Sequence, residues 1–259
     1  MTARRRVGIL GGTFDPVHCG HLDVGAAAQA ALGLEELLVL PSNIPPHRPQ
    51  PIASSYHRFA MVALAILGRP GWRALDLELR EDGRSYTSET LHRLHDDGFT
   101  AQELFFVTGA DAFLEIATWK NYPAVLDLAH FAVVSRPGVP VGTLPAQLPA
   151  LAVRMRVIPS TVRLNTYSEA PPVNKPDTTY TAGEVRLKPH ATEKTEGAHE
   201  TVIFLIDAAT ANVSATAIRR ARAHSEPIAG MVPPQVRQHI EQHALYEDVT
   251  PAAGAGGGS

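Results

Sequence analysis

Two histidines three residues apart, His18 and His21, carry the spacing in this sequence that most directly suggests chemistry. If a helix begins there, both imidazoles share a face of its first turn and can donate hydrogen bonds to phosphate oxygens. The stretch opens with Gly11 and Gly12, which let the backbone approach a ligand closely. A helix N-terminus adds free N–H groups and partial positive charge. We therefore predict a phosphate-binding loop from Gly11 to His21.

Two common phosphate motifs do not describe this loop. No Gly-Lys-Ser/Thr follows the glycines, and the spacing is not G-x-G-x-x-G. Two other interpretations stay open: solvated or core histidines, and a metal bound by His18, His21 and Asp15. The metal alternative lacks a further ligand in the usual zinc arrangement, so we predict no metal site in the protein itself.

A second anion site is indicated far downstream, at Val213–Arg219. Ser214 is a suitable N-cap and Thr216 falls in the first turn of the helix that would follow. Arg219 lies one turn further on and could reach the same end with its guanidinium. Alternatively, Ser214 is only a cap and Arg219 a solvated charge.

The elements that must position these residues alternate along the chain. Short apolar runs stopped by Gly or Pro predict buried strands, and amphipathic or Ala-rich stretches between them predict helices. This alternation predicts an α/β fold whose parallel sheet is covered on both faces, with ligands bound at the strand ends. The predicted strands are 7–10, 37–40, 74–79, 103–108, 130–135, 153–158 and 202–206. The predicted helices are 22–32, 58–67, 87–95, 111–118, 214–223 and 233–243.

Length and composition indicate one domain over residues 1–250. The chain has 259 residues, of which 44% are hydrophobic. Residues 160–200 are rich in Thr, Pro, Glu and Lys, and we interpret them as an inserted loop or hairpin arm. The Gly/Ala-rich end, 251–259, is predicted to be a flexible tail.

Charge and cysteine content exclude several protein classes. A net charge of −3 argues against a protein that wraps nucleic acid or coats anionic membranes. No apolar run approaches the roughly 18–20 residues of a membrane span, and the apolar run after the basic N-terminus is too short for a signal peptide. Cys19 is the single cysteine, so we expect no intrachain disulfide and a reducing, cytoplasmic location. A monomer and a homo-oligomer both stay open.

Together the two motifs resemble the nucleotidyltransferase superfamily that carries the H-x-G-H signature. Its first motif reads G-G-T-F-D-P-x-H-x-G-H and its second I-S-x-T-x-I-R, here with Val213 for the first Ile and Ala215 where Ser is common. The narrower resemblance is to the bacterial nicotinate-nucleotide adenylyltransferases. Further segments carry it: 41–48, 85–87, 109–111, 119–120, 135–138 and 232–246.

This resemblance implies a Rossmann-like, three-layer αβα fold with a mostly parallel central sheet and an inserted arm. The implied reaction is adenylyl transfer from ATP to nicotinate mononucleotide, giving nicotinate adenine dinucleotide and pyrophosphate. The attacking 5′-phosphate is already anionic, so no general base is needed. Catalysis would consist of positioning and charge stabilisation. Mg²⁺ is expected with ATP, held mostly by phosphate and water.

The resemblance also implies residue roles. The catalytic contacts would come from His18, His21 and Arg219. The implied ATP-binding residues are Gly12, Thr13, Phe14, Arg136, Ser214, Thr216 and Arg219. The implied mononucleotide-binding residues are His47, Arg48, Thr87, Asp111, Trp119 and Lys120.

In the mononucleotide site Trp119 would stack on the pyridine ring. Thr87 and the backbone near Lys120 would receive the nicotinate carboxylate, and Asp111 a ribose hydroxyl. Each has an ordinary alternative: a core aromatic for Trp119, a helix cap for Asp111 and solvated charges for the arginines.

Three rival functions remain. The first is a sibling enzyme that uses nicotinamide mononucleotide or phosphopantetheine as acceptor, or a cytidylyltransferase. The second is a non-catalytic nucleotide-binding sensor. The third is a metal-dependent hydrolase that uses His18 and His21.

Overall fold

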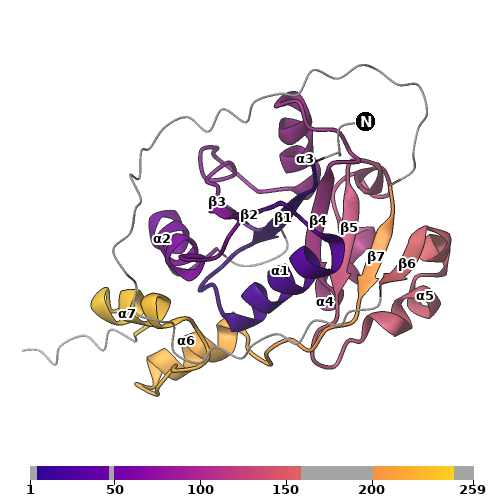
Figure 1. The fold of residues 1–259 in the computed structure, drawn as a ribbon. Helices are drawn as coiled ribbons and strands as arrows, with labels where there is room; N and C mark the ends of the chain where they lie inside the picture. Colours follow the sequence, from indigo (N-terminus) through magenta and orange to yellow (C-terminus); the bar gives the residue numbers. More distant parts are fainter. Residues whose placement is uncertain (1–4, 47–49, 159–200, 248–259) are drawn as a thin grey trace, which may run out of the picture.

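The computed structural model describes residues 5–46, 50–158 and 201–247. Within them one seven-stranded sheet runs in the order β3-β2-β1-β4-β5-β7-β6, and every neighbouring pair is parallel (Figure 1). The strands are β1 Val7–Gly12, β2 Glu36–Pro41, β3 Trp72–Ala74, β4 Leu104–Gly109, β5 His130–Val134, β6 Met155–Ile158 and β7 Ile203–Ile206. The expected parallel α/β sheet is confirmed.

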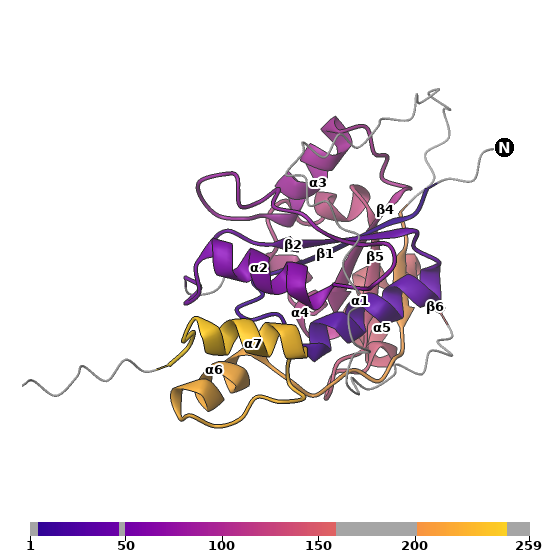
Figure 2. The same ribbon diagram turned by 60° about the vertical axis from the view of Figure 1, so that its left-hand side comes forward.

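Helices cover both faces of the sheet. In Figure 2, α3 lies above β1 and β2, whereas α1, α2 and α7 lie below them. The α-helices are α1 Cys19–Leu32, α2 Ser55–Ala65, α3 Thr87–Asp96, α4 Ala110–Phe113, α5 Leu144–Gln147, α6 Ala215–Ala223 and α7 Pro234–Gln242. In the described ranges, four 3-10 helices add to the connections: η1 Ile116–Thr118, η2 Ala124–Asp127, η3 Val141–Thr143 and η4 Pro149–Arg154.

Alternation along the strands separates the core into two layers. On β1, Val7 and Ile9 join the cluster under α3, whereas Leu10 joins the cluster under α1, α2, α6 and α7. Successive strand side chains point to opposite faces. Both faces are apolar because both are covered, which is why the strands read as continuous apolar runs.

Two predicted elements are wrong in extent. The strand predicted over 74–79 ends at Ala74, after which Leu75 N–H still donates to Val39 O (3.0 Å) and a turn closes from Leu79 N–H to Asp76 O (2.9 Å). β3 is an edge strand that pairs only with β2. No described strand pairs with the outer side of β3, so the chain gives up no strand hydrogen bonds on that side when it leaves the sheet after Ala74.

The helix predicted over 111–118 is likewise shorter. It consists of the four residues of α4 and then η1, because Glu115 N–H and Thr118 N–H donate to carbonyls three residues back, the 3-10 pattern. The sequence period did not distinguish this tight winding from an α-helix.

Three predicted features lie outside the described residues. They are the insertion at 160–200, the tail at 251–259, and the pair His47 and Arg48. None of the helices in the described part is long and apolar enough to cross a membrane.

Candidate active site

The two histidines of the first motif lie where β1 ends and α1 begins. His18 is the N-cap residue of α1 and His21 lies in its first turn. Their rings stack with centroids 3.7 Å apart and an interplanar angle of 26°. The backbone N–H of His18 donates to His21 Nδ1 (3.3 Å), which orients the second imidazole. The shared helical face expected from the spacing is thus formed.

The His18 imidazole is held in its neutral form. Burial, with a smaller contribution from the nearby Arg136 charge, lowers the pKa of His18 to about 3. Its Nδ1 is buried and has no hydrogen-bond partner among the residues that the structure describes. A buried polar atom without a partner is costly and uncommon, and it is characteristic of functional sites completed by a ligand or water.

Backbone geometry shapes the loop that joins β1 to α1. Phe14 has a positive φ of 50° and a buried side chain whose ring meets His21 edge-on at 5.0 Å. A Cβ on Gly12 would lie 3.0 Å from the Phe14 ring, so glycine leaves room for this packing. The backbone carbonyl of Thr13 accepts a hydrogen bond from Arg58 Nη1 (2.8 Å).

The second motif is brought onto the first by Arg219. Its Nη1 donates to the backbone carbonyl of Asp15 (2.7 Å) across 204 residues of sequence. Arg219 Nη2 also contacts Thr216 Oγ1 (3.3 Å), and Ser214 Oγ accepts from Ala217 N–H (3.1 Å) as the N-cap of α6. Both Ser214 and Thr216 are exposed.

Arg136 joins the start of α1 to the second motif from another side. Its guanidinium donates to Gly20 O (3.2 Å) and Val213 O (3.3 Å), and lies 3.5 Å from Thr210 Oγ1. A Cβ on Gly20 would lie 2.7 Å from Arg136 Nη1. The glycine of the H-x-G-H signature therefore admits this guanidinium, a reason that the sequence pattern alone did not reveal.

Two of the residues expected to bind the pyridine substrate, Thr87 and Lys120, lie at the start of α3. Thr87 is its first residue, and Lys120 Nζ reaches that helix through Glu89 Oε1 (2.5 Å) while lying 4.2 Å from the Tyr86 ring centroid. The hydrogen bond to Glu89 raises the pKa of Lys120. The segment of Trp119 and Lys120 is thus fastened beside Thr87.

Trp119 is half-buried, with its ring edge-on to Phe106 at 5.7 Å. Asp111 is exposed one residue beyond the first position of α4, close to Gly109 at the end of β4. Trp119 is therefore anchored in the core and only partly available to a ligand, whereas the Asp111 carboxylate is open to solvent.

Comparison with known proteins gives this geometry a family. A family model described as Cytidylyltransferase-like matches residues 9–221, which include both motifs. The chain belongs to the cytidylyltransferase-like family.

Full-length relatives within the family share a name. Proteins from Desulfatibacillum aliphaticivorans (35% identical, 93% of this chain and 99% of that one) and Cronobacter sakazakii strain ATCC BAA-894 (36%, 91% and 93%) are each called probable nicotinate-nucleotide adenylyltransferase. The resemblance expected from the sequence is confirmed by these relatives.

Among solved structures, Plasmodium falciparum nicotinic acid mononucleotide adenylyltransferase complexed with NaAD matches with a TM-score of 0.62. The match covers 93% of this chain and 97% of that one. At 15% identity this likeness concerns the fold alone, and it confirms the Rossmann-like architecture.

Sequence reasoning missed a buried hub that supports the loop of this cytidylyltransferase-like chain. The Asp15 carboxylate is 5% exposed and accepts hydrogen bonds from Ile52 N–H (2.8 Å), Ala53 N–H (3.0 Å) and the Tyr246 hydroxyl (2.9 Å). Burial and the Asp15 charge raise the pKa of Tyr246, so the hydroxyl keeps its proton and remains a donor. Asp15 is thus a structural anchor of the loop.

Arg58, on α2, is the other missed residue. It is 1% exposed, and besides Thr13 it donates to the carbonyls of Ala53 (3.2 Å), Ser42 (2.5 Å) and Asn43 (3.1 Å). Burial lowers the pKa of Arg58, with Asp15 opposing the shift. An arginine that opens an otherwise apolar helical run was the available signal.

Proposed function

We propose that this chain transfers the adenylyl group of ATP to nicotinate mononucleotide, releasing pyrophosphate. The observation that carries the proposal is the hydrogen bond from Arg219 to Asp15 O, because it sets the second anion-binding motif against the histidine loop. The full-length relatives bear the name of this activity.

The transfer exchanges one phosphorus–oxygen bond for another. An oxygen of the mononucleotide 5′-phosphate attacks the α-phosphorus of ATP, and the bond from that phosphorus to the β-phosphate oxygen breaks. Both the nucleophile and the leaving pyrophosphate are anions that need no proton transfer. The protein must therefore position the two phosphates and offset their charge.

The loop residues suit those two tasks. A neutral His18 can donate from a single nitrogen, and the stacked His21, at the N-terminal end of α1, lies where the helix dipole favours anions. Arg219, with 27% of its side chain exposed, can meet the β- and γ-phosphates together with Ser214 and Thr216. Gly12, Thr13 and Phe14 would line the phosphates through backbone.

Arg136 would act at the ATP site by more than direct contact with ATP. Its donors already serve Gly20 O and Val213 O, so we assign it the task of holding the two motifs together while adding positive charge near the phosphates.

The residues proposed to bind the acceptor lie at the start of α3 and after the end of β4. Trp119 would stack on the pyridine ring, Thr87 and the backbone at Lys120 would receive the carboxylate, and Asp111 would accept from a ribose hydroxyl. Two contacts support these roles: the packing of Trp119 on Phe106 fixes the indole, and the ion pair with Glu89 ties Lys120 to the helix that begins at Thr87. The parts of His47 and Arg48 stay predictions.

Mg²⁺ would enter with ATP as part of the substrate. The carboxylate within the loop, that of Asp15, already accepts three hydrogen bonds, so the ion would be held chiefly by phosphate oxygens and water. Its contribution would be to neutralise phosphate charge. A cytoplasmic location and the choice between monomer and homo-oligomer stay predictions.

Acceptor choice tests the proposal directly. The purified chain is incubated with ATP, Mg²⁺ and one of three acceptors, and pyrophosphate release is measured. We expect release with nicotinate mononucleotide, and a comparison with nicotinamide mononucleotide defines the preference between carboxylate and amide. Release with phosphopantetheine alone would overturn the proposal, and nucleotide binding without release would indicate a sensor. Hydrolysis of ATP in the absence of any acceptor, lost on removal of transition metals, would favour a hydrolase.

A further inference from the structure

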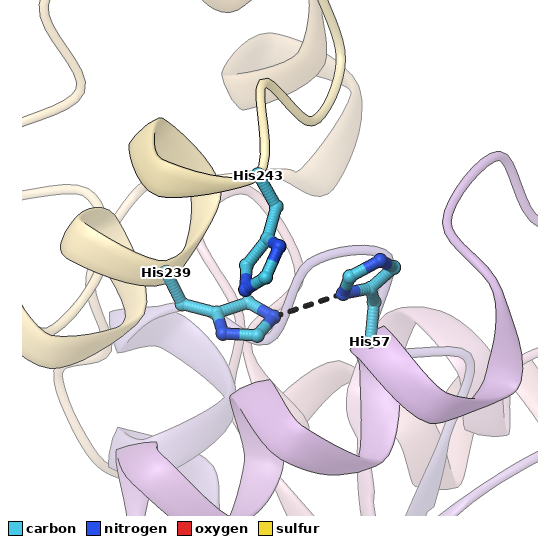
Figure 3. Close-up of side chains that lie close together, drawn as sticks. All are labelled: His57, His239 and His243. Atoms are coloured by element: carbon cyan, nitrogen blue, oxygen red, sulfur yellow. Dashed lines mark hydrogen bonds between the residues drawn. The ribbon is translucent and has the colours of Figure 1, made fainter.

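Three histidines outside the phosphate site converge between α2 and α7. His57 lies on α2, His239 on α7, and His243 is the C-cap residue of α7 (Figure 3). One ring nitrogen from each lies within 4.8 Å of the others, and His57 Nδ1 is 3.1 Å from His239 Nε2. The rings of His243 and His239 are 4.5 Å apart, and those of His243 and His57 are 4.9 Å apart.

Helical spacing explains how one short segment supplies two of the three imidazoles. His239 and His243 are four residues apart, so they project from the same side of α7. α7 packs directly against α2, which presents His57 to that side. Figure 3 shows the three rings turned toward a common point.

We propose that His57, His239 and His243 form a binding site for a divalent transition metal ion of the zinc class. Imidazole nitrogen is a preferred ligand of such ions. Zinc sites with three protein ligands keep a fourth position for water. His243 is exposed, which places that fourth position at the solvent side.

The distances suit this ion. Two nitrogens bound to tetrahedral zinc at about 2.0–2.1 Å are about 3.3 Å apart, close to the 3.1 Å between His57 and His239. The third nitrogen needs only a side-chain adjustment, since it belongs to the exposed His243 at the end of α7. A hydrogen bond between two histidines accounts for one pair but leaves the convergence of the third unexplained.

The site would also fasten two elements that hold the phosphate loop. Arg58, adjacent to His57, donates to Thr13 O, and Tyr246, three residues beyond His243, donates to Asp15. A metal here would therefore stabilise the support of the loop without touching the substrates. This inference departs from the expectation of no protein metal site, which considered only the neighbourhood of His18.

Zinc binding to the full chain tests the proposal. The protein, prepared without a histidine tag and stripped with a chelator, is titrated with Zn²⁺ at pH 7.5 against a chromophoric competitor. We expect one equivalent to bind. Loss of a direct ligand should weaken binding by roughly 100-fold or more, since changes in outer-shell partners alone cost about 10–100-fold. His57→Gln, His239→Gln and His243→Gln should each show this.

Matched variants separate this site from other histidines. His92→Gln, an exposed histidine on α3, should bind zinc as the unsubstituted chain does. Zinc that binds equally well to the three cluster variants, or that is lost instead in His18→Gln or His21→Gln, would overturn the proposal.

A second measurement uses the unsubstituted chain, so it does not depend on how the variants fold. X-ray absorption of the bound zinc should show three imidazole ligands, and Co²⁺ in its place should give the visible spectrum of a four-coordinate ion. Fewer than three imidazoles, or a six-coordinate cobalt spectrum, would contradict a three-histidine site.

Discussion

The chemistry of His18 is decided by its surroundings more than by its residue type. A solvated imidazole would titrate near neutrality. This one is buried at the N-terminus of α1 near the Arg136 guanidinium, so it stays neutral. His21, stacked on it, is oriented by the backbone N–H of His18 and by ring contacts with His18 and Phe14. The pair therefore presents hydrogen-bond donors and not an acid–base couple.

We expect His21→Ala to lower turnover by about 10²–10³, because losing one preorganised donor to developing charge has that cost. Pyrophosphate release under saturating substrates measures it, and the melting temperature should change little. His18→Ala should also lower turnover strongly. Unchanged turnover in the His21 variant would contradict the proposed phosphate contact.

The lowered pKa of His18 makes a prediction about acid stability. The folded state binds a proton at His18 only near pH 3, whereas the unfolded chain binds it near pH 6.5. Stability is therefore lost as pH falls below 6.5, and His18 alone should account for about 2 kcal/mol between pH 7 and pH 5.

His18→Asn, which keeps a good N-cap residue, should show a correspondingly smaller loss between those pH values in urea unfolding. His92→Asn, a substitution at an exposed site, should lose as much as the unsubstituted chain. Equal losses in all three proteins would show that His18 does not titrate in this way.

Trp119 belongs both to the core and to the site, and its substitution should separate the two substrates. We expect Trp119→Ala to raise KM for nicotinate mononucleotide several-fold, in keeping with about 1 kcal/mol for a lost ring contact. KM for ATP should change less, and Trp119→Phe should restore most of the effect. Steady-state kinetics with each substrate varied in turn gives both constants. Equal rises in both would contradict stacking on the pyridine ring.

At the scale of elements, helices other than α1 hold the phosphate loop in place. α2 contributes Arg58 to the Thr13 carbonyl in the loop and to the Ser42 carbonyl after β2, and the segment after α7 contributes Tyr246 to Asp15. α6 contributes Arg219 to the same loop. The loop conformation, with its positive φ at Phe14, is therefore imposed by three elements distant in sequence.

We expect Arg58→Met to lower the free energy of unfolding by about 3 kcal/mol or more, because several buried carbonyls would lose their donor. Urea unfolding measures this loss. Arg80→Met is the matched control: it breaks an exposed ion pair with Asp76, and such pairs contribute about 0–1 kcal/mol. Similar losses in the two variants would show that the carbonyl contacts of Arg58 contribute little.

At the scale of the whole molecule, the site lies at the reversal of the strand order. β1 connects toward β2 and β3 on one side, whereas β4 and β5 continue on the other. Connections leave the sheet in opposite directions there, so the carboxyl ends of β1 and β4 lie at the general ligand position in such sheets. The phosphate loop follows β1, and Asp111 and Trp119 follow β4.

Because the site draws on segments from both ends of the chain, ligand binding should stabilise the whole fold. Nicotinate adenine dinucleotide at about 100 times its Kd should raise Tm by roughly 5 °C. Scanning calorimetry should show one transition that moves as a unit, as expected for a single domain. Two transitions, with only one shifted by ligand, would contradict the single-domain prediction.

The sequence by itself determined the strand–helix alternation, the parallel sheet and the family. Each follows from local sequence patterns. Continuous apolar runs predict buried strands, and the first motif is unbroken, with histidines that lie within one turn of each other. The strand at 74–79 and the helix at 111–118 were wrong in extent, because an edge position and a 3-10 turn leave no distinct period in the residues.

Only the tertiary structure decided which distant residues meet. The contact of Arg219 with Asp15, the clamp of Arg136 on Gly20 and Val213, and the buried contacts of Arg58 all cross long stretches of chain. So does the meeting of His57 with His239 and His243. Such contacts depend on strand order and on how helices pack on a face, and these follow from burial of the whole core rather than from any local spacing.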